Sequence, residues 1–288
     1  MKLVAAVLFT ALLALPSGAA ADRPAPAPKL PEITVDDTMA GMQVAPDLVR
    51  EAALDCRVSD ARRIGYDERT GGAFYELACR GGEGFIVAAP KPDPKQPPQP
   101  LRVYSCLEAT SAKQAIANGA GCRLAENADP KAGIAALVAA VHPGCRMTDA
   151  RAIGHTDAAT MLEVACAGGG GFIVQASYPL SGERAATFTP CAGYQPGMTL
   201  QCVLTPASAA DAYLAGLVAK AGKPCQLKTH RYVGLGVGLS DTGDAYFEVA
   251  CQGGTGFMLD VDAAGNVYPT PCDQAGYMAG GCKLTKTR

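Results

Sequence analysis

A pattern of eleven residues that occurs three times constrains the fold of this chain more than any other feature. Its copies read YELACRGGEGF, LEVACAGGGGF and FEVACQGGTGF and begin at residues 75, 162 and 247, so they lie 87 and 85 residues apart. Self-similar segments at a nearly constant interval are typical of repeated structural units. This pattern, called the signature below, therefore predicts three modules of about 80 residues, a size at which small cores benefit from cross-links.

The cysteines follow the same interval. The chain has twelve, four per predicted module in matching order: Cys56, Cys79, Cys106, Cys122, Cys145, Cys166, Cys191, Cys202, Cys225, Cys251, Cys272 and Cys282. An even number of cysteines in an exported chain predicts disulfides. Four cysteines allow three pairings, so the connectivity within a module stays open. Each disulfide would stabilise a module by about 3 kcal/mol in the loop-entropy estimate.

The N-terminal residues have the pattern of a signal peptide. Lys2 supplies a positive charge, residues 3–15 are apolar, and residues 19–21 form a small-residue cleavage site. The apolar run is too short to cross a bilayer as a helix. We expect cleavage before Asp22 and a mature chain that is exported to the periplasm or secreted, without membrane insertion.

The spacing predicts an α+β fold of three tandem repeats, each with a short N-terminal helix and a small antiparallel sheet stapled by disulfides. The expected segments are 1–21 (signal peptide), 22–44 (Pro-rich spacer), 45–128, 129–204 and 205–288 (modules one to three). Helices are expected at 47–54, 131–141 and 207–221, because Pro46, Pro130 and Pro206 stand at a first helical position and apolar residues recur at helical spacing. Asp129 and Thr205 are the expected side-chain caps. Residues 33–42 fit either an extra strand or a tether.

Strands are expected around the signature. The first cysteine of a module opens a strand, the signature strand returns antiparallel to it, and the Gly-Gly-x-Gly segment bends the chain into the next strand. The fourth cysteine lies on a short closing strand, at Cys122–Leu124 in the first module. A strand rather than a helix follows the glycines, so they are expected to supply positive φ for a turn or bulge and not a phosphate cradle.

A pair of opposite charges also recurs. An arginine on the first strand and the signature glutamate return in every module: Arg62 and Glu76, Arg151 and Glu163, Arg231 and Glu248. Folding the first two hairpins brings each arginine across the ladder from its glutamate, whereas an insertion leaves the third pairing open. We interpret the pairs as structural and worth at most about 1 kcal/mol each.

Composition and spacing argue against several classes of function. Without Lys2 the chain has 24 basic residues (25 − 1) against 27 acidic ones, so it lacks the basic excess that attracts nucleic acid. The closest cysteines, Cys272 and Cys282, are ten positions apart, too far for a structural zinc site or a C-x-x-C redox motif. We expect no metal and no cofactor.

One segment interrupts the repeated pattern. Residues 90–100 contain six prolines and are expected to form a stiff, solvated loop. This proline loop is either a tolerated insertion or a docking loop for a partner. The candidate partner-binding residues are Pro90, Pro92, Pro94, Pro97, Pro98 and Pro100.

Structural residues are triplicated here, but no reactive group is. The sequence therefore predicts a non-enzymatic exported repeat protein that binds a protein or a cell-envelope component, with its oligomeric state left open. The alternative is a secreted or periplasmic inhibitor of a lytic or proteolytic enzyme, presenting hairpin loops to the active site. An enzyme would have its site in the divergent third module, around His230, Arg231 and Asp241.

Overall fold

The computed structural model describes residues 32–97, 99–111, 121–156, 158–178, 186–194, 197–236 and 244–285. The described residues belong to one compact unit. The predicted signal peptide, the spacer up to residue 31, Pro98 and Asp241 lie outside the described residues.

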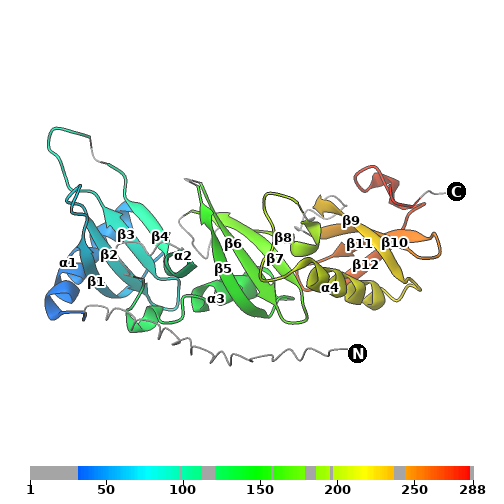
Figure 1. Ribbon diagram of the computed structural model, residues 1–288, viewed down its shortest axis with the longest axis horizontal. Helices are drawn as coiled ribbons and strands as arrows, with labels where there is room; N and C mark the ends of the chain where they lie inside the picture. The colour runs from blue at the N-terminus through cyan, green and yellow to red at the C-terminus, as the bar shows by residue number, and fades with distance from the viewer. Residues whose placement is uncertain are drawn as a thin grey trace, which may run out of the picture. The chain divides into compact units, whose positions relative to one another are not determined.

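Three antiparallel sheets of four strands form the framework (Figure 1). Each sheet runs through its strands in chain order, so every connection is a hairpin. The strands of the first sheet are β1 (Val58–Tyr66), β2 (Ala73–Cys79), β3 (Phe85–Ala89) and β4 (Arg102–Ser105). Those of the second are β5 (Met147–His155), β6 (Ala159–Cys166), β7 (Gly171–Ser177) and β8 (Thr187–Pro190). Those of the third are β9 (Leu227–Leu235), β10 (Ala245–Cys251), β11 (Gly256–Val261) and β12 (Val267–Pro271). The α+β class with antiparallel sheets is confirmed.

The helices lie between and beside the sheets: α1 (Val35–Glu51), α2 (Cys106–Ser111), α3 (Ala132–Val141) and α4 (Ala207–Lys220), with 3-10 turns at Ala125–Asn127, Cys191–Gly193 and Ala275–Tyr277. Helices α3 and α4 match their predicted ranges. Their predicted side-chain caps are wrong, because Thr205 gives its backbone N–H to a carboxylate and Asp129 accepts the N–H of Lys131 before the helix begins. None of the described helices is long and apolar enough to cross a membrane.

Helix α1 differs from the prediction. It begins at Val35, within the predicted spacer, and Pro46 lies inside it rather than at its start. The hydroxyl of Thr34 accepts the N–H of Asp37 at 3.1 Å and caps the helix. Acidic side chains in the first turn add favourable dipole interactions. This local cap determines the start of α1, and the proline is accommodated further along, so residues 33–42 are neither a strand nor a tether.

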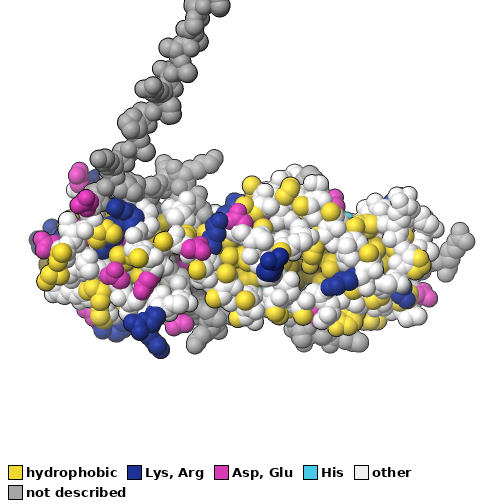
Figure 2. Space-filling view, turned by 90° about the horizontal axis from the view of Figure 1, so that it is seen from below, with side chains coloured by type: hydrophobic (Ala, Val, Ile, Leu, Met, Phe, Trp, Pro, Cys, Tyr) yellow, Lys and Arg dark blue, Asp and Glu magenta, His cyan; other side chains and the backbone are white. Residues whose placement is uncertain are grey.

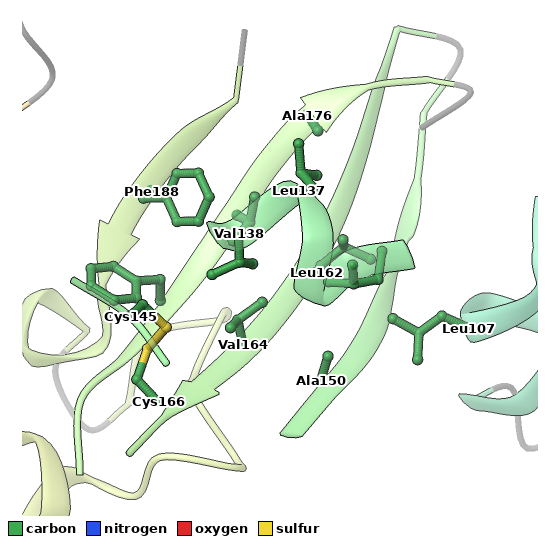
Figure 3. Close-up of a cluster of buried hydrophobic side chains, with 13 residues drawn as sticks. Leu107, Leu137, Val138, Cys145, Ala150, Leu162, Val164, Cys166, Ala176 and Phe188 are labelled. Atoms are coloured by element: carbon green, nitrogen blue, oxygen red, sulfur yellow. A yellow bond between two sulfur atoms is a disulfide. The ribbon is translucent and has the colours of Figure 1, made fainter. Parts of the chain in front are cut away.

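Each sheet buries one face under a helix. Ala45 and Leu48 of α1 pack on the first sheet, and Leu214 and Val218 of α4 pack on the third. In the second sheet, Leu137 and Val138 of α3 lie over strand residues such as Val164 (Figure 3). The apolar stripes predicted for α3 and α4 are therefore the surfaces that close these cores.

The first and second sheets are joined by side chains that cross from one to the other. Leu107 of α2 is 1% exposed and belongs to the core of the second sheet, which it enters from the side in Figure 3. The hydroxyl of Tyr178, which follows β7, accepts the N–H of Val103 at 3.0 Å and donates to its carbonyl at 2.5 Å. His155 of β5 lies 2.6 Å from the Glu108 carboxylate and stacks on the Tyr178 ring. These contacts tie β4 and α2 to the second sheet.

Candidate functional site

All twelve cysteines are paired, and the pairing is the same in each sheet. The first cysteine of a set bonds the second and the third bonds the fourth: Cys56–Cys79, Cys106–Cys122, Cys145–Cys166, Cys191–Cys202, Cys225–Cys251 and Cys272–Cys282. The first kind of bond links the end of the signature strand to the residues before the opening strand. The second kind holds the loop around the fourth cysteine against the sheet. Every cysteine is therefore occupied structurally.

The recurring arginine and glutamate face each other in all three sheets, including the third. The register pairs Arg62 with Glu76, and the equivalent residues pair in the other two sheets. The Arg62 Nε lies 2.6 Å from the Glu76 carboxylate, and all three glutamate side chains are 0% exposed. The predicted cross-strand pairing is confirmed, and the carboxylate of each pair is fully buried, which differs from the surface pair on which the estimate of about 1 kcal/mol is based.

The loop after the fourth cysteine wraps around this carboxylate. The second oxygen of Glu76 accepts the backbone N–H groups of Arg123 and Leu124 at 2.6 and 2.8 Å. Glu163 and Glu248 each accept three consecutive N–H groups from the equivalent loops. The closing strand predicted for the fourth cysteine is absent from Cys122–Leu124 and its two equivalents, because these N–H groups point at a side chain instead of a neighbouring strand.

The last glycine of each signature is required by this wrapping loop. A Cβ on Gly84, Gly171 or Gly256 would lie 2.0–2.2 Å from a side-chain oxygen of the loop, on Asn127, Thr205 or Thr285 respectively. None of these three glycines has a positive φ, whereas Gly81 and Gly254, earlier in the run, do. The prediction of positive φ therefore holds for the turn, and the last glycine serves close approach.

The buried glutamates do not form a metal site. Carboxylate and sulfur atoms do come within 4.8 Å of one another in two clusters, around Glu76 and around Glu163. Their cysteines are disulfide-bonded, however, so they offer no thiolate. The carboxylate oxygens are already occupied by N–H donors. In the described residues these glutamates, arginines and cysteines bind one another or the backbone.

The histidines lie at contacts between sheets. The His142 ring lies 4.4 Å from the Phe172 ring at a tilted angle, and its Nδ1 has no hydrogen-bond partner among the described residues; burial lowers the pKa of its ring. His230 Nε2 lies 3.1 Å from the Ala192 carbonyl, and Arg231 is bound to Glu248. Two of the three residues proposed for an enzyme site therefore have structural partners, and the third lies outside the described residues.

The proline loop borders a cavity on the first sheet. This cavity has a volume of about 570 Å³, and its walls come from α1, from the β1–β2 hairpin and from the loop. Val44 and Leu48 supply the α1 wall, Tyr66 and Tyr75 the hairpin wall, and Pro90, Pro92 and Pro97 the loop wall. A volume of this size and a mixed apolar and polar lining are typical of ligand sites.

A chain of contacts holds the tyrosine wall in place. Arg63 of β1 donates to the Tyr66 hydroxyl at 2.9 Å, and its guanidinium lies 5.1 Å from the ring centroid. The same guanidinium donates to Asp37 of α1 at 3.1 Å. The hydrogen bond from Thr34 and the one from Arg63 lower the pKa of Asp37, while burial opposes them. The helix cap is thus linked to the exposed ring of Tyr66.

A second, smaller cavity lies at the base of the same loop. It measures about 250 Å³ and shares Ala73, Ala89, Pro90 and Gln99 with the larger one. Arg102 and Tyr104 of β4 complete its wall. The proline loop therefore separates two adjoining hollows. Of the predicted candidate residues, Pro90, Pro92 and Pro97 line the larger cavity, and Pro90 and Pro100 the smaller; Pro94 lines neither.

Sequence reasoning identified the loop but not the opposite wall. Tyr75 enters the sequence prediction only as the first residue of the signature, Val44 falls within the predicted spacer, and Tyr66 has no predicted role. The Thr34–Asp37 spacing was the available signal for the longer helix. On the face shown in Figure 2, the Lys and Arg side chains are distributed over the surface and not gathered in one patch.

Comparison with known proteins does not add a function. No protein-family model matches the chain, and no curated protein matches it in sequence.

Proposed function

We propose that the three sheets are tandem repeats of one disulfide-stapled unit, and that the chain is an exported, non-enzymatic protein that binds a protein or cell-envelope component. The shared strand order, the shared disulfide pairing and the three wrapped glutamates support the repeat. Six disulfides favour an oxidising compartment such as the periplasm or the extracellular space.

The observation that carries the binding function is the cavity under the proline loop. The three repeated glutamates are fully buried and bound by arginines and backbone N–H groups, so they are not offered to a substrate. The loop is found in one repeat only, and it encloses about 570 Å³ between prolines and two tyrosines. Prolines limit the conformations that the loop must give up on binding, which favours affinity.

Removal of the tyrosine wall should weaken binding without unfolding the protein. Tyr66 is 60% exposed, so Tyr66→Ala removes contact area from the cavity at little cost to the core. We expect the affinity for a ligand purified from envelope extract to fall about tenfold or more, as measured by calorimetry. Replacing residues 91–97 with glycine and serine should have a similar effect.

Tyr268 is the matched control, since it is 53% exposed but lies on β12 of the third sheet. Tyr268→Ala should leave the affinity unchanged. Equal losses for both tyrosine variants would show that the cavity is not the binding site. No ligand in any envelope fraction would count against the proposed function itself.

A second function, inhibition of a lytic or proteolytic enzyme, is favoured by the tip of the loop. Asp93 accepts the N–H of Lys95 at 2.9 Å through its side chain and that of Gln96 at 3.1 Å through its carbonyl, so the tip is held in a turn. Residues 91–97 are all exposed. Rates of a lysozyme and protease panel that stay unchanged with added protein would exclude this function.

A further inference from the structure

The ninth position of the first signature holds an acid that the other copies lack. Glu83 corresponds to Gly170 and Thr255. Its side chain is buried, with 8% of the residue exposed, although an ionised carboxylate is costly to bury. One oxygen accepts the N–H of Leu107 at 3.2 Å, and the other is buried without a hydrogen-bond partner. This acid is not part of the wrapped glutamate described above.

Glu83 lies where the first sheet meets the second. Leu107, whose N–H it accepts, inserts its side chain into the core of the second sheet. On the other side, Gly133 of α3 approaches so closely that a Cβ there would lie 2.6 Å from the Glu83 backbone nitrogen. The Glu83 backbone therefore lies against the start of α3, while its buried carboxyl is bound to α2.

The charged groups around Glu83 do not neutralise it. On the α3 side, Asp129 carries a like charge, and Lys131 is bound to Asp149. On the α2 side, Glu108 is bound to His155. No salt bridge to Glu83 is found among the described residues. Among the described residues no cation balances this carboxyl; burial and, to a lesser degree, Asp129 raise the pKa of Glu83 to about 8, while the Leu107 N–H opposes this.

We propose that Glu83 is a proton-operated latch between the first and second sheets. The neutral carboxyl closes the contact of α2 and α3 with the signature turn, and ionisation of the carboxyl loosens it. Loosening exposes Leu107 and separates α2 from the second core. The other two repeats, with glycine and threonine in this position, have no such latch.

The direction of the pH effect follows from the raised pKa. An exposed glutamate ionises near 4.5, whereas Glu83 in the closed contact ionises near 8. The equilibrium constant for the closed contact is therefore highest below pH 4.5, where Glu83 is protonated in both the closed and the loosened state. It falls by up to about tenfold per pH unit until about pH 8, and above that pH Glu83 is ionised in both states. His155 also contacts Glu108 of α2, so its contribution is separated by a variant.

Amide hydrogen exchange of the intact, oxidised chain tests the latch at the Leu107 N–H itself. After correction for intrinsic exchange, protection of Leu107 should fall at least about tenfold between pH 5 and pH 8 in the natural sequence. Glu83→Gln should remove this fall while keeping a neutral side chain of the same shape. Glu83→Thr, the residue of the third copy, is a second variant if glutamine disturbs packing.

Two controls make the outcome decisive. Glu68→Gln changes an exposed acid in the β1–β2 turn and should leave the fall in protection unchanged. His155→Gln should leave the fall in Leu107 protection in place, because the fall depends on Glu83 and not on His155. Equal pH dependence in the natural chain and in both Glu83 variants, or a flat profile in the natural chain, would overturn the proposal.

Discussion

Replacing Glu76 with glutamine is expected to lower the free energy of unfolding by about 3–5 kcal/mol, because it removes one partner of a buried ion pair. The Arg62 side chain is only 6% exposed, so its charge would be left unpaired. The NH₂ group of glutamine would also face an N–H donor, because the Glu76 carboxylate accepts hydrogen bonds from Arg62 Nε and from the backbone of Arg123 and Leu124. Urea unfolding without reductant, followed by far-UV circular dichroism, measures the loss.

The other two glutamates provide a graded comparison. Arg151 and Arg231 are 30% and 31% exposed in their side chains, so water can partly solvate the arginine left behind. Glu163→Gln and Glu248→Gln should therefore lower the free energy of unfolding by less than Glu76→Gln does. Glu68→Gln, at an exposed turn position, should change stability by less than about 0.5 kcal/mol. A cost below about 1 kcal/mol for Glu76→Gln would show that the wrapped carboxylate does not hold the loop.

Gly256→Ala is expected to destabilise the protein by about 3 kcal/mol or more, through overpacking. The new methyl group would lie 2.2 Å from the Thr285 hydroxyl and 2.6 Å from the Val249 carbonyl. The latter is backbone and cannot move away without breaking the β10–β11 pairing. The midpoint of thermal unfolding, measured by circular dichroism, should fall accordingly.

Gly253→Ala is the control in the same signature. Its Cβ would meet nothing within 4 Å, and its φ is not in the left-handed region. We expect its stability to stay close to that of the natural chain. If the two alanine variants lost equal stability, the close approach of the wrapping loop would not be the reason for the last glycine.

The parts of the fold that depend on local pattern could be predicted from the sequence. Helices α3 and α4 follow from apolar residues at helical spacing, and the hairpins follow from the turns and the signature. Helix α1 could not be placed, because its start depends on the Thr34 cap while Pro46 resembles a first helical residue. The predicted strand at the fourth cysteine of each module is wrong for another reason. The N–H groups of that loop bind a glutamate 47 and 48 positions earlier, an interaction that no local pattern reveals.

Only the part of the candidate site that is local in sequence could be predicted. The proline loop is evident in the composition of residues 90–100, but its cavity requires Tyr66, Tyr75 and Leu48 from three other elements. Glu83 was visible only as a variable position of the signature. Helix α3, which packs on the second sheet, approaches the Glu83 backbone closely, so the burial of Glu83 depends on packing between the first two sheets.

The contact of Tyr178 with Val103 has a consequence for self-association. The outward N–H and carbonyl of Val103 would otherwise be free to pair with a strand of another molecule, a common route to aggregation. In the third sheet the corresponding residue is Pro269, which faces Leu259 as Val103 faces Val87. Proline has no N–H to offer. The outermost strands β4 and β12 are thus protected by different means, one by a neighbour's hydroxyl and the other by its own covalent structure.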